Sequence, residues 1–170
     1  ASWSRGLGDV YKRQFMYSPL KGEEIYKDSL TNGFKKSGVS DKKDKFEIVT
    51  TVIGRVCDEE EVDEYLYPAR NVYTLYVGGM GAKSKNFYYN LFCEYGYEDI
   101  ADELQNLYLS GNKKESEKMF PKELLEELTL VGTKKDIEKK VEMWKESNVT
   151  EISLSLPIDF ETVKFIKELL

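Results

Sequence analysis

Arg55 is the residue whose type and position most clearly suggest chemistry. It lies near the carboxyl end of an almost wholly apolar run at residues 46–57, FEIVTTVIGRVC. A guanidinium group in such a run is costly unless it is paired or reaches solvent. Two interpretations stay open: contact with a cofactor or substrate, or a salt bridge with the acidic run at residues 58–61.

The chain contains no histidine. This absence excludes Ser-His-Asp and Cys-His catalysis, histidine-ligated metals and imidazole acid-base chemistry. Cys57 and Cys93 are too far apart for a CxxC redox pair, and nothing near them forms a zinc-ligand cluster. We therefore expect two free thiols and no metal site, and the sequence assigns no catalytic residue.

A glycine-rich segment at residues 78–81 follows a long amphipathic pattern. Glycine is common at helix ends, so a helix cap followed by a turn is the simpler interpretation. The alternative is that this backbone approaches a cofactor or substrate. Asn86 suits a helix N-cap with Phe87 and Tyr88 packed inward, or these three residues line the mouth of a ligand site.

Asp159 follows the apolar run at residues 149–156, with Pro157 and Ile158 between them. All three residues would lie at the carboxyl end of a strand, but Asp159 is also well placed to cap the next helix, which is the commoner role. The chain has 12 tyrosines, and several lie on the apolar stripe of the pattern at residues 58–80. We expect those to be core or dimer-interface residues.

The composition predicts a folded, soluble domain. Hydrophobic residues make up 41%, aromatic residues 13% and charged residues 33% of the chain. The 25 Lys and Arg residues against 31 Asp and Glu give a net charge of -6, which opposes binding to nucleic acid and to anionic membranes. No apolar run has the length of a membrane span, so we expect a cytoplasmic protein.

The elements that must position these residues alternate between helix and strand. The patterns predict a helix from Ser18-Pro19 to Ser37-Gly38, a buried strand at 46–57, and a long helix at 58–80 with Asp58 and Glu61 as its capping box. Pro68 lies off the apolar stripe of that helix and can kink it.

The second half of the chain is mostly helical. Further helices are predicted at residues 86–95 and 98–109, after Pro121, and from a capping box of Thr133 and Asp136 to about residue 147. A strand at 149–156 and a terminal helix follow. This alternation indicates an α/β fold with a parallel sheet, whose two predicted strands need neighbours on both edges.

Residues 1–14 differ from the rest of the chain because they are basic and show neither helical nor strand periodicity. The segment resembles translated sequencing adaptor, so we expect a non-native leader that contributes nothing to the fold. The alternative is an ordinary disordered leader. The domain is then expected to span residues 15–170.

Four segments carry a family resemblance: YVGGMG at 76–81, KNFYYNLF at 85–92, YGYEDIADELQNLYLSG at 95–111, and FPKELLEELTLVGTKKDIEKKV at 120–141. In order and spacing they resemble the last third of the luciferase-like oxidoreductases. The deazaflavin-dependent branch similar to methylenetetrahydromethanopterin reductase is the nearest in pattern. The resemblance extends back through FMYSPLKGEE and covers nearly all of residues 15–170.

The resemblance implies the C-terminal part of a TIM (β/α)8 barrel, incomplete, with a helical excursion between the last two strands. It implies hydride transfer between coenzyme F420, a deazaflavin, or less favourably FMN, and a small organic substrate, with a monooxygenase reaction as a further alternative. It also implies a homodimer. The family's glycine-rich segments that contact the coenzyme phosphate have no counterpart here, so we expect the chain by itself to bind cofactor poorly.

A second hypothesis belongs to a different functional class. The chain would be a stand-alone half-barrel without catalysis, which acts as an interaction module and pairs with itself or with a partner half to cover its strand edges. This hypothesis predicts a stable dimer that holds no cofactor.

Overall fold

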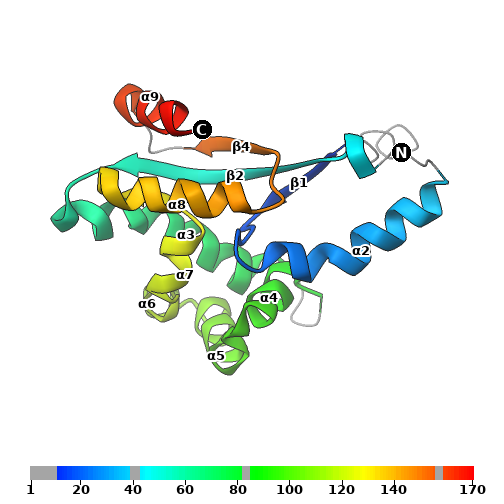
Figure 1. The fold of residues 1–170 in the computed structure, drawn as a ribbon. Coiled ribbons are helices and arrows are strands. Elements are labelled where there is room, and N and C mark those ends of the chain that lie inside the picture. Colours follow the sequence, from blue (N-terminus) through cyan, green and yellow to red (C-terminus); the bar gives the residue numbers. More distant parts are fainter. Residues whose placement is uncertain (1–10, 39–42, 82–84, 156–158) are drawn as a thin grey trace.

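A computed structural model describes residues 11–38, 43–81, 85–155 and 159–170. In it a parallel sheet is combined with helices, as the sequence predicted (Figure 1). Within the described ranges, no helix is both long enough and apolar enough to cross a membrane.

Strand β2 (Glu47–Val56) is the centre of a four-stranded sheet. It pairs in parallel with β1 (Tyr11–Phe15) along residues 47–51, with β4 (Glu151–Ser155) along residues 49–53, and with β3 (Leu130–Gly132) along residues 54–56. The apolar run at 46–57 is therefore confirmed as a strand. Six of its ten residues are buried, and its backbone has paired neighbours on both edges.

Strand β1 corrects one expectation. Residues 11–14 were expected to contribute nothing to the fold, yet they form most of β1, in register with Glu47–Thr50. Strand pairing uses backbone N–H and C=O groups, so a segment without alternating side chains can still take an edge position. Residues 1–10 lie outside the described part of the chain, and the foreign origin of the leader stays a prediction.

Two further elements were not predicted. Strand β3 has only three residues, too few to show a period of two. Helix α6 (Lys113–Met119) is almost wholly polar and so lacks an apolar stripe. It is held instead by Ser116, whose hydroxyl donates to the carbonyl of Leu104 in the preceding helix at 2.8 Å.

The other helices agree with the sequence patterns. They are α2 (Gly22–Ser37), α3 (Val62–Gly79), α4 (Phe87–Phe92), α5 (Glu98–Leu109), α7 (Lys122–Glu127), α8 (Lys134–Glu146) and α9 (Phe160–Leu169). Both predicted capping boxes are present, at Asp58 and Glu61 and at Thr133 and Asp136. Helix α2 begins later than expected because the Ser18 hydroxyl first accepts the backbone N–H of Lys21 and forms a turn.

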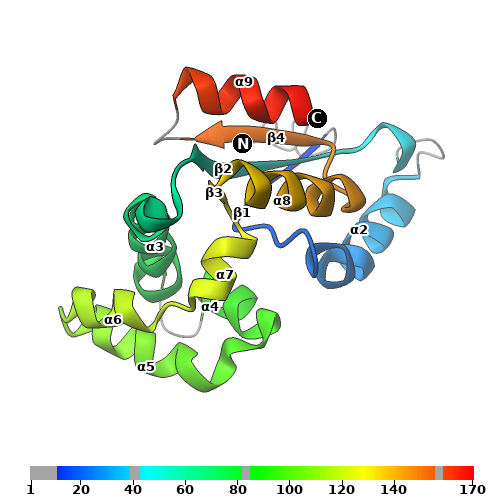
Figure 2. The same cartoon turned by 60° about the vertical axis from the view of Figure 1, so that its left-hand side comes forward.

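The helices lie on different sides of the sheet. Helix α9 lies beyond β4, while α4, α5, α6 and α7 form a group at the opposite end of the molecule (Figures 1 and 2). A single apolar core joins the sheet to that group, with Val52, Tyr73, Leu104 and Trp144 among its fully or almost fully buried members. The helical excursion between β2 and β4 is thus part of the same core as the sheet.

Candidate functional site at the carboxyl end of strand β2

Arg55 lies one residue before the end of β2, and two side chains from other elements contact it. Its Nη1 forms an ion pair with the carboxylate of Asp159, at the start of α9. Its Nη2 donates to the hydroxyl of Tyr65 on α3 at 3.3 Å, and the guanidinium carbon lies 4.7 Å from the centre of that ring. The side chain of Arg55 is 25% exposed, so the group is largely removed from water but still reachable.

The ion pair was expected with the acidic run at 58–61, and that expectation is wrong. The side chains of Asp58 and Glu61 instead hold each other's backbone N–H groups in the capping box of the turn before α3. This leaves Asp159, which is 104 residues away in sequence, as the carboxylate paired with Arg55 among the described residues. Tyr65 is one of the tyrosines on the apolar stripe of the pattern at residues 58–80, and that pattern does not predict its contact with Arg55.

Asp159 is confirmed as the N-cap of α9. Its Oδ1 accepts the backbone N–H of Thr162 at 2.7 Å. This hydrogen bond, with the charge of Arg55 as a smaller contribution, lowers the pKa of Asp159 below its ordinary value. Pro157 and Ile158, the other two residues considered for this edge, lie outside the described residues.

A second link ties the same helix to the same strand. The backbone N–H of Val56 donates to the hydroxyl of Thr162 at 3.0 Å. The first turn of α9 is therefore fastened to the end of β2 at two points, Arg55 with Asp159 and Val56 with Thr162. No sequence pattern predicts the second link, since a buried threonine in a helix is common.

The glycines at residues 78–79 end helix α3, as the helix-cap interpretation predicted. Tyr108 of α5 packs against both of them, and a Cβ atom on Gly78 would lie only 2.6 Å from the Cβ of Tyr108. Glycine is therefore required here for helix packing. The space over these residues is occupied by a tyrosine of the same chain.

Asn86 is confirmed as the N-cap of α4, and its side chain also forms hydrogen bonds with the end of α3. Its Oδ1 accepts the backbone N–H groups of Tyr88 and Tyr89 at 2.9 and 3.2 Å. Its Nδ2 donates to the carbonyls of Tyr76 and Val77 at the end of α3, at 2.9 and 2.8 Å. This one buried amide therefore joins the end of one helix to the start of the next.

Aromatic side chains gather where β1 ends. The ring of Phe15 lies 5.2 Å from Tyr73, 4.7 Å from Tyr76 and 6.2 Å from Tyr88, measured between ring centres. Burial raises the pKa of the Tyr88 hydroxyl. Phe87, next to this cluster, is half exposed. Packing accounts for most of these aromatic residues, and Phe87 is the one that faces outward.

Met16, directly after β1, was not recognised from the sequence. It has a φ of 57° although it is not glycine, and it is buried. The hydroxyl of Tyr95 donates to its carbonyl at 2.5 Å and accepts the N–H of Ser18 at 3.1 Å. Tertiary hydrogen bonds therefore hold Met16 in a backbone conformation that methionine rarely adopts. No local sequence pattern predicts this conformation.

The two cysteines are free, as expected. Burial raises the pKa of both thiols, so both are protonated near neutral pH. The described part of the chain contains no group of three or more His, Cys, Asp or Glu residues arranged to hold a metal ion.

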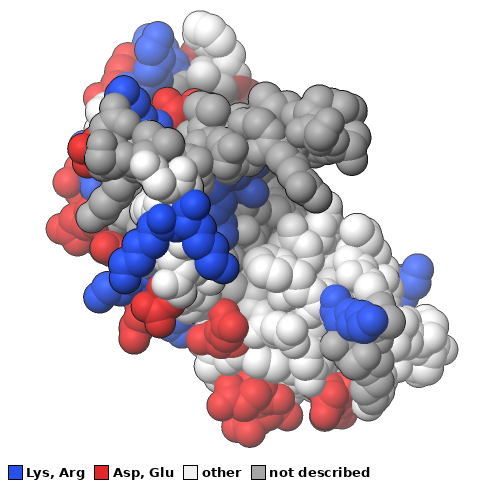
Figure 3. All heavy atoms as spheres, turned by 90° about the vertical axis from the view of Figure 1, so that its right-hand side faces the viewer, with Lys and Arg blue, Asp and Glu red and all other residues white. Residues whose placement is uncertain are grey.

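Figure 3 shows positive and negative side chains around a broad uncharged area on one face.

Comparison with known proteins adds the following. No family model matches the chain. A curated protein of Mycobacterium tuberculosis, named as a coenzyme F420-dependent oxidoreductase, is 30% identical over 134 residues, which cover 79% of this chain and 38% of that protein. The chain therefore spans about two fifths of the length of this relative.

Two solved structures share the fold. The coenzyme F420-dependent tetrahydromethanopterin reductase of Methanopyrus kandleri superposes with a TM-score of 0.64 at 18% identity, over 94% of this chain and 43% of that one. An F420-dependent secondary alcohol dehydrogenase, solved with an F420-acetone adduct, superposes with a TM-score of 0.59 at 13% identity, over 95% and 42% of the two chains. The resemblance of this chain to the luciferase-like, coenzyme F420-dependent oxidoreductases is thereby confirmed.

Proposed function

We propose that this chain forms part of the (β/α)8 barrel of a coenzyme F420-dependent oxidoreductase that transfers hydride between the deazaflavin and a small organic substrate. The observation that carries the proposal is the 30% identity over 134 residues to a protein named for that activity. The names of the relatives favour coenzyme F420 over FMN, and hydride transfer over a reaction with oxygen. The bound deazaflavin would supply the hydride chemistry.

The chain accounts for only part of a barrel. Strands β1, β2 and β4 lie side by side, whereas a TIM barrel closes with eight strands. We propose that residues 15–170 are its C-terminal portion, that residues 1–14 are not native, and that activity belongs to the completed barrel. The helical excursion from α3 to α7 lies between the last two long strands, β2 and β4.

Within this chain we propose Arg55 as a contact for the cofactor or substrate. TIM barrels bind ligands at the carboxyl ends of their strands, and Arg55 lies at that end of β2. Its Nε is buried without a hydrogen-bond acceptor among the described residues, so an anionic group such as the coenzyme phosphate would fit the unused donor. Asp159 and Tyr65 would hold the guanidinium in place.

The test is equilibrium binding of coenzyme F420, followed by the fluorescence of the deazaflavin. We expect the chain alone to bind feebly, and the chain joined to the unmatched part of its Mycobacterium relative to bind well. In the joined protein, Arg55→Met should weaken binding about tenfold to a hundredfold, since a charge-assisted hydrogen bond contributes roughly 1.5–3 kcal/mol. Tight binding of FMN in place of coenzyme F420 would contradict the proposal.

The sheet also favours a second candidate, a half-barrel interaction module without catalysis. Among the described residues, β1 and β4 each pair only with β2, which leaves an edge of each strand open. This candidate predicts a homodimer, without cofactor, whose dissociation depends on concentration. Analytical ultracentrifugation of the chain, with and without coenzyme F420, separates the two candidates.

A further inference from the structure

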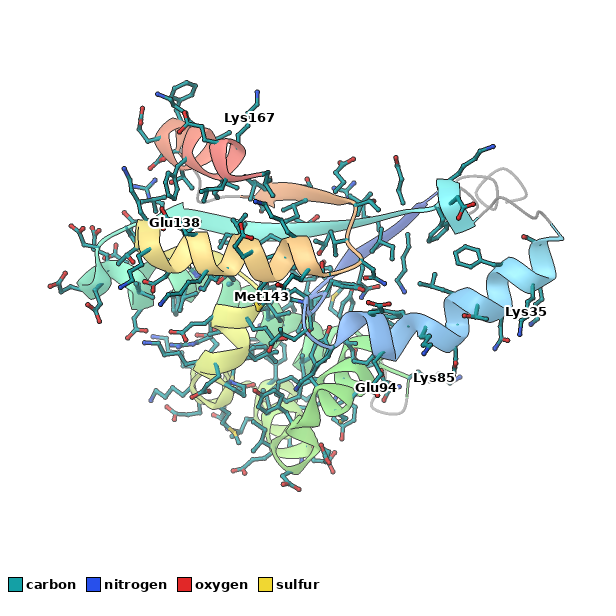
Figure 4. All side chains as sticks on the ribbon, viewed as in Figure 1. Lys35, Lys85, Glu94, Glu138, Met143 and Lys167 are labelled. Carbon is teal, nitrogen blue, oxygen red and sulfur yellow. The ribbon has the colours of Figure 1, made fainter. Side chains whose placement is uncertain are left out.

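Helix α2 is anchored to the rest of the chain at its first turns. Gly22 and Tyr26 are its buried residues, and the ring of Tyr26 stacks on that of Tyr17 with 5.6 Å between their centres. The helix then runs outward, so that Lys35 near its far end lies well away from Met143 on α8 (Figures 1 and 4). The inner side of α2 is therefore only partly covered beyond Tyr26.

A cleft of about 590 Å³ lies between α2 and the amino ends of β2 and β4. The wall formed by α2 consists of residues on one face of the helix, which are Glu23, Lys27, Leu30, Thr31, Phe34 and Lys35. The opposite wall includes Phe46, Ile48, Asn148 and Thr150. Small-molecule sites have volumes of about 300–1,000 Å³, so the cleft has the size of such a site.

This cleft is separate from the proposed cofactor site. It lies at the amino end of β2, whereas Arg55 lies near the carboxyl end, where TIM barrels bind their ligands. Strand β2 already has β1 on one edge and β4 on the other. Further strands of a barrel would therefore join at the outer edges of β1 and β4, and would not enter a cleft whose two walls belong to this chain.

The middle of the cleft is apolar. Its apolar side chains are Leu30, Phe34, Phe46 and Ile48. The rings of Phe34 and Phe46 meet edge to face with 5.2 Å between their centres, and both are only partly buried. This contact places Lys35 and Asp44 at the same end of the cleft, where their opposite charges offset each other. A ligand with an apolar body would cover the exposed parts of these rings.

Two hydrogen-bond donors in the cleft have no acceptor. Among the described residues, no carboxylate forms an ion pair with Lys27, which lies in the middle of α2. Glu23, by contrast, lies in the first turn of α2, where the helix dipole favours a negative charge. The Oδ1 of Asn148 accepts the hydroxyl of Tyr17, and its Nδ2 has no described acceptor. Free donors of this kind favour an anionic group.

We propose that this cleft binds a small amphipathic anion, a carboxylate or sulfonate with an aromatic or aliphatic body. The body lies between the apolar side chains of α2 and those of Phe46 and Ile48, and Lys27 and the Asn148 amide donate to the anionic group. A cationic ligand would leave both donors unused. The proposal is independent of the proposed function, because the site contains neither Arg55 nor the carboxyl ends of the strands.

The experiment titrates the full chain with anilinonaphthalene sulfonate, whose fluorescence rises in an apolar site. A parallel titration uses phenylnaphthylamine, which has the same rings without the sulfonate. We expect the sulfonate to bind about tenfold more tightly, because it alone accepts charge-assisted hydrogen bonds. Lys27→Met should remove this difference and leave the binding of phenylnaphthylamine unchanged. Thr31→Trp should abolish the binding of both probes, because the indole ring would occupy the cleft.

Lys36→Met is the matched control. Lys36 is exposed on the same helix but does not line the cleft, so this variant should bind both probes like the parent chain. Lys27 and Thr31 are also exposed, so their substitution should preserve the fold. Circular dichroism of each variant checks this, and only folded variants are compared.

Three results would overturn the proposal. The first is equal affinity of the parent chain for the two probes, and the second is equal weakening of sulfonate binding by Lys36→Met and Lys27→Met. The third is a homodimer, detected by light scattering, that excludes the probes and that Thr31→Trp disrupts, which would make a second copy the occupant. Failure of the joined protein to bind coenzyme F420 would contradict the proposed function and leave this site standing.

Discussion

Asp159 uses its two carboxylate oxygens for different partners: one accepts the backbone N–H of Thr162 and the other pairs with Arg55. The same side chain therefore starts helix α9 and holds the guanidinium group at the end of β2. Two substitutions of Asp159 separate these roles, because one removes only the charge and the other removes both the charge and the cap.

Asp159→Asn keeps a good N-cap and removes the ion pair, whereas Asp159→Ala removes both. We expect Asn to change the free energy of unfolding little, because the pair is partly exposed, and Ala to lower it by about 1 kcal/mol. Urea unfolding followed by circular dichroism measures both. Equal losses for the two variants would contradict the dual role.

The contribution of Asp159 should depend on pH. Its pKa is lowered in the folded protein, so the folded state binds the proton less tightly than the unfolded state. The stabilisation is therefore complete above the ordinary aspartate pKa of about 4 and is lost as the pH falls through the lowered value. Unfolding of the parent chain and of Asp159→Asn between pH 2 and pH 6 should converge at the acid end.

Lys12 gives a pH dependence of the same direction in the alkaline range. Its Nζ lies 3.3 Å from the centre of the Tyr26 ring, and burial lowers its pKa to about 8. The unfolded chain binds this proton more tightly, so stability should rise with pH between about 8 and 10.5 relative to Lys12→Met. Thermal melts across that range test this, and parallel pH profiles for the two proteins would count against it.

Gly78→Ala should destabilise the protein by about 1–3 kcal/mol, because the new methyl group would collide with Tyr108 in a packed interface. Gly33→Ala is the matched control in helix α2. There a Cβ atom meets nothing within 4 Å, so the substitution should stabilise by about 0.5–1 kcal/mol. A similar effect at both positions would show that helix propensity, not packing, decides the outcome.

Asn86→Ala removes an N-cap and the Nδ2 donor of the carbonyls of Tyr76 and Val77, of which the Val77 carbonyl keeps only a longer hydrogen bond, from Nε2 of Gln105 at 3.4 Å. We expect a loss of about 2–3 kcal/mol, more than for an ordinary cap. Asn112→Ala, at the start of α6, makes a control because that side chain caps nothing. Chemical denaturation of both variants gives the comparison.

How much could be predicted from the sequence varied between elements. The run at 46–57 and the capping boxes at Asp58 and Thr133 lie in contiguous residues, so their patterns predicted the elements correctly. Strand β1 and helix α6 have no such local pattern, since pairing with β2 and packing against α5 hold them. Local composition contains no information about either neighbour.

The candidate site divides in the same way. Sequence alone identified Arg55 as a buried cation needing a partner, Asp159 as a helix cap, and the luciferase-like resemblance, because each follows from a few adjacent residues or from their order. Only the tertiary structure decided that Asp159 is that partner and that Tyr65 shares the contact. The physical reason is that parallel pairing brings the carboxyl ends of β2 and β4 together, although about a hundred residues of chain separate them.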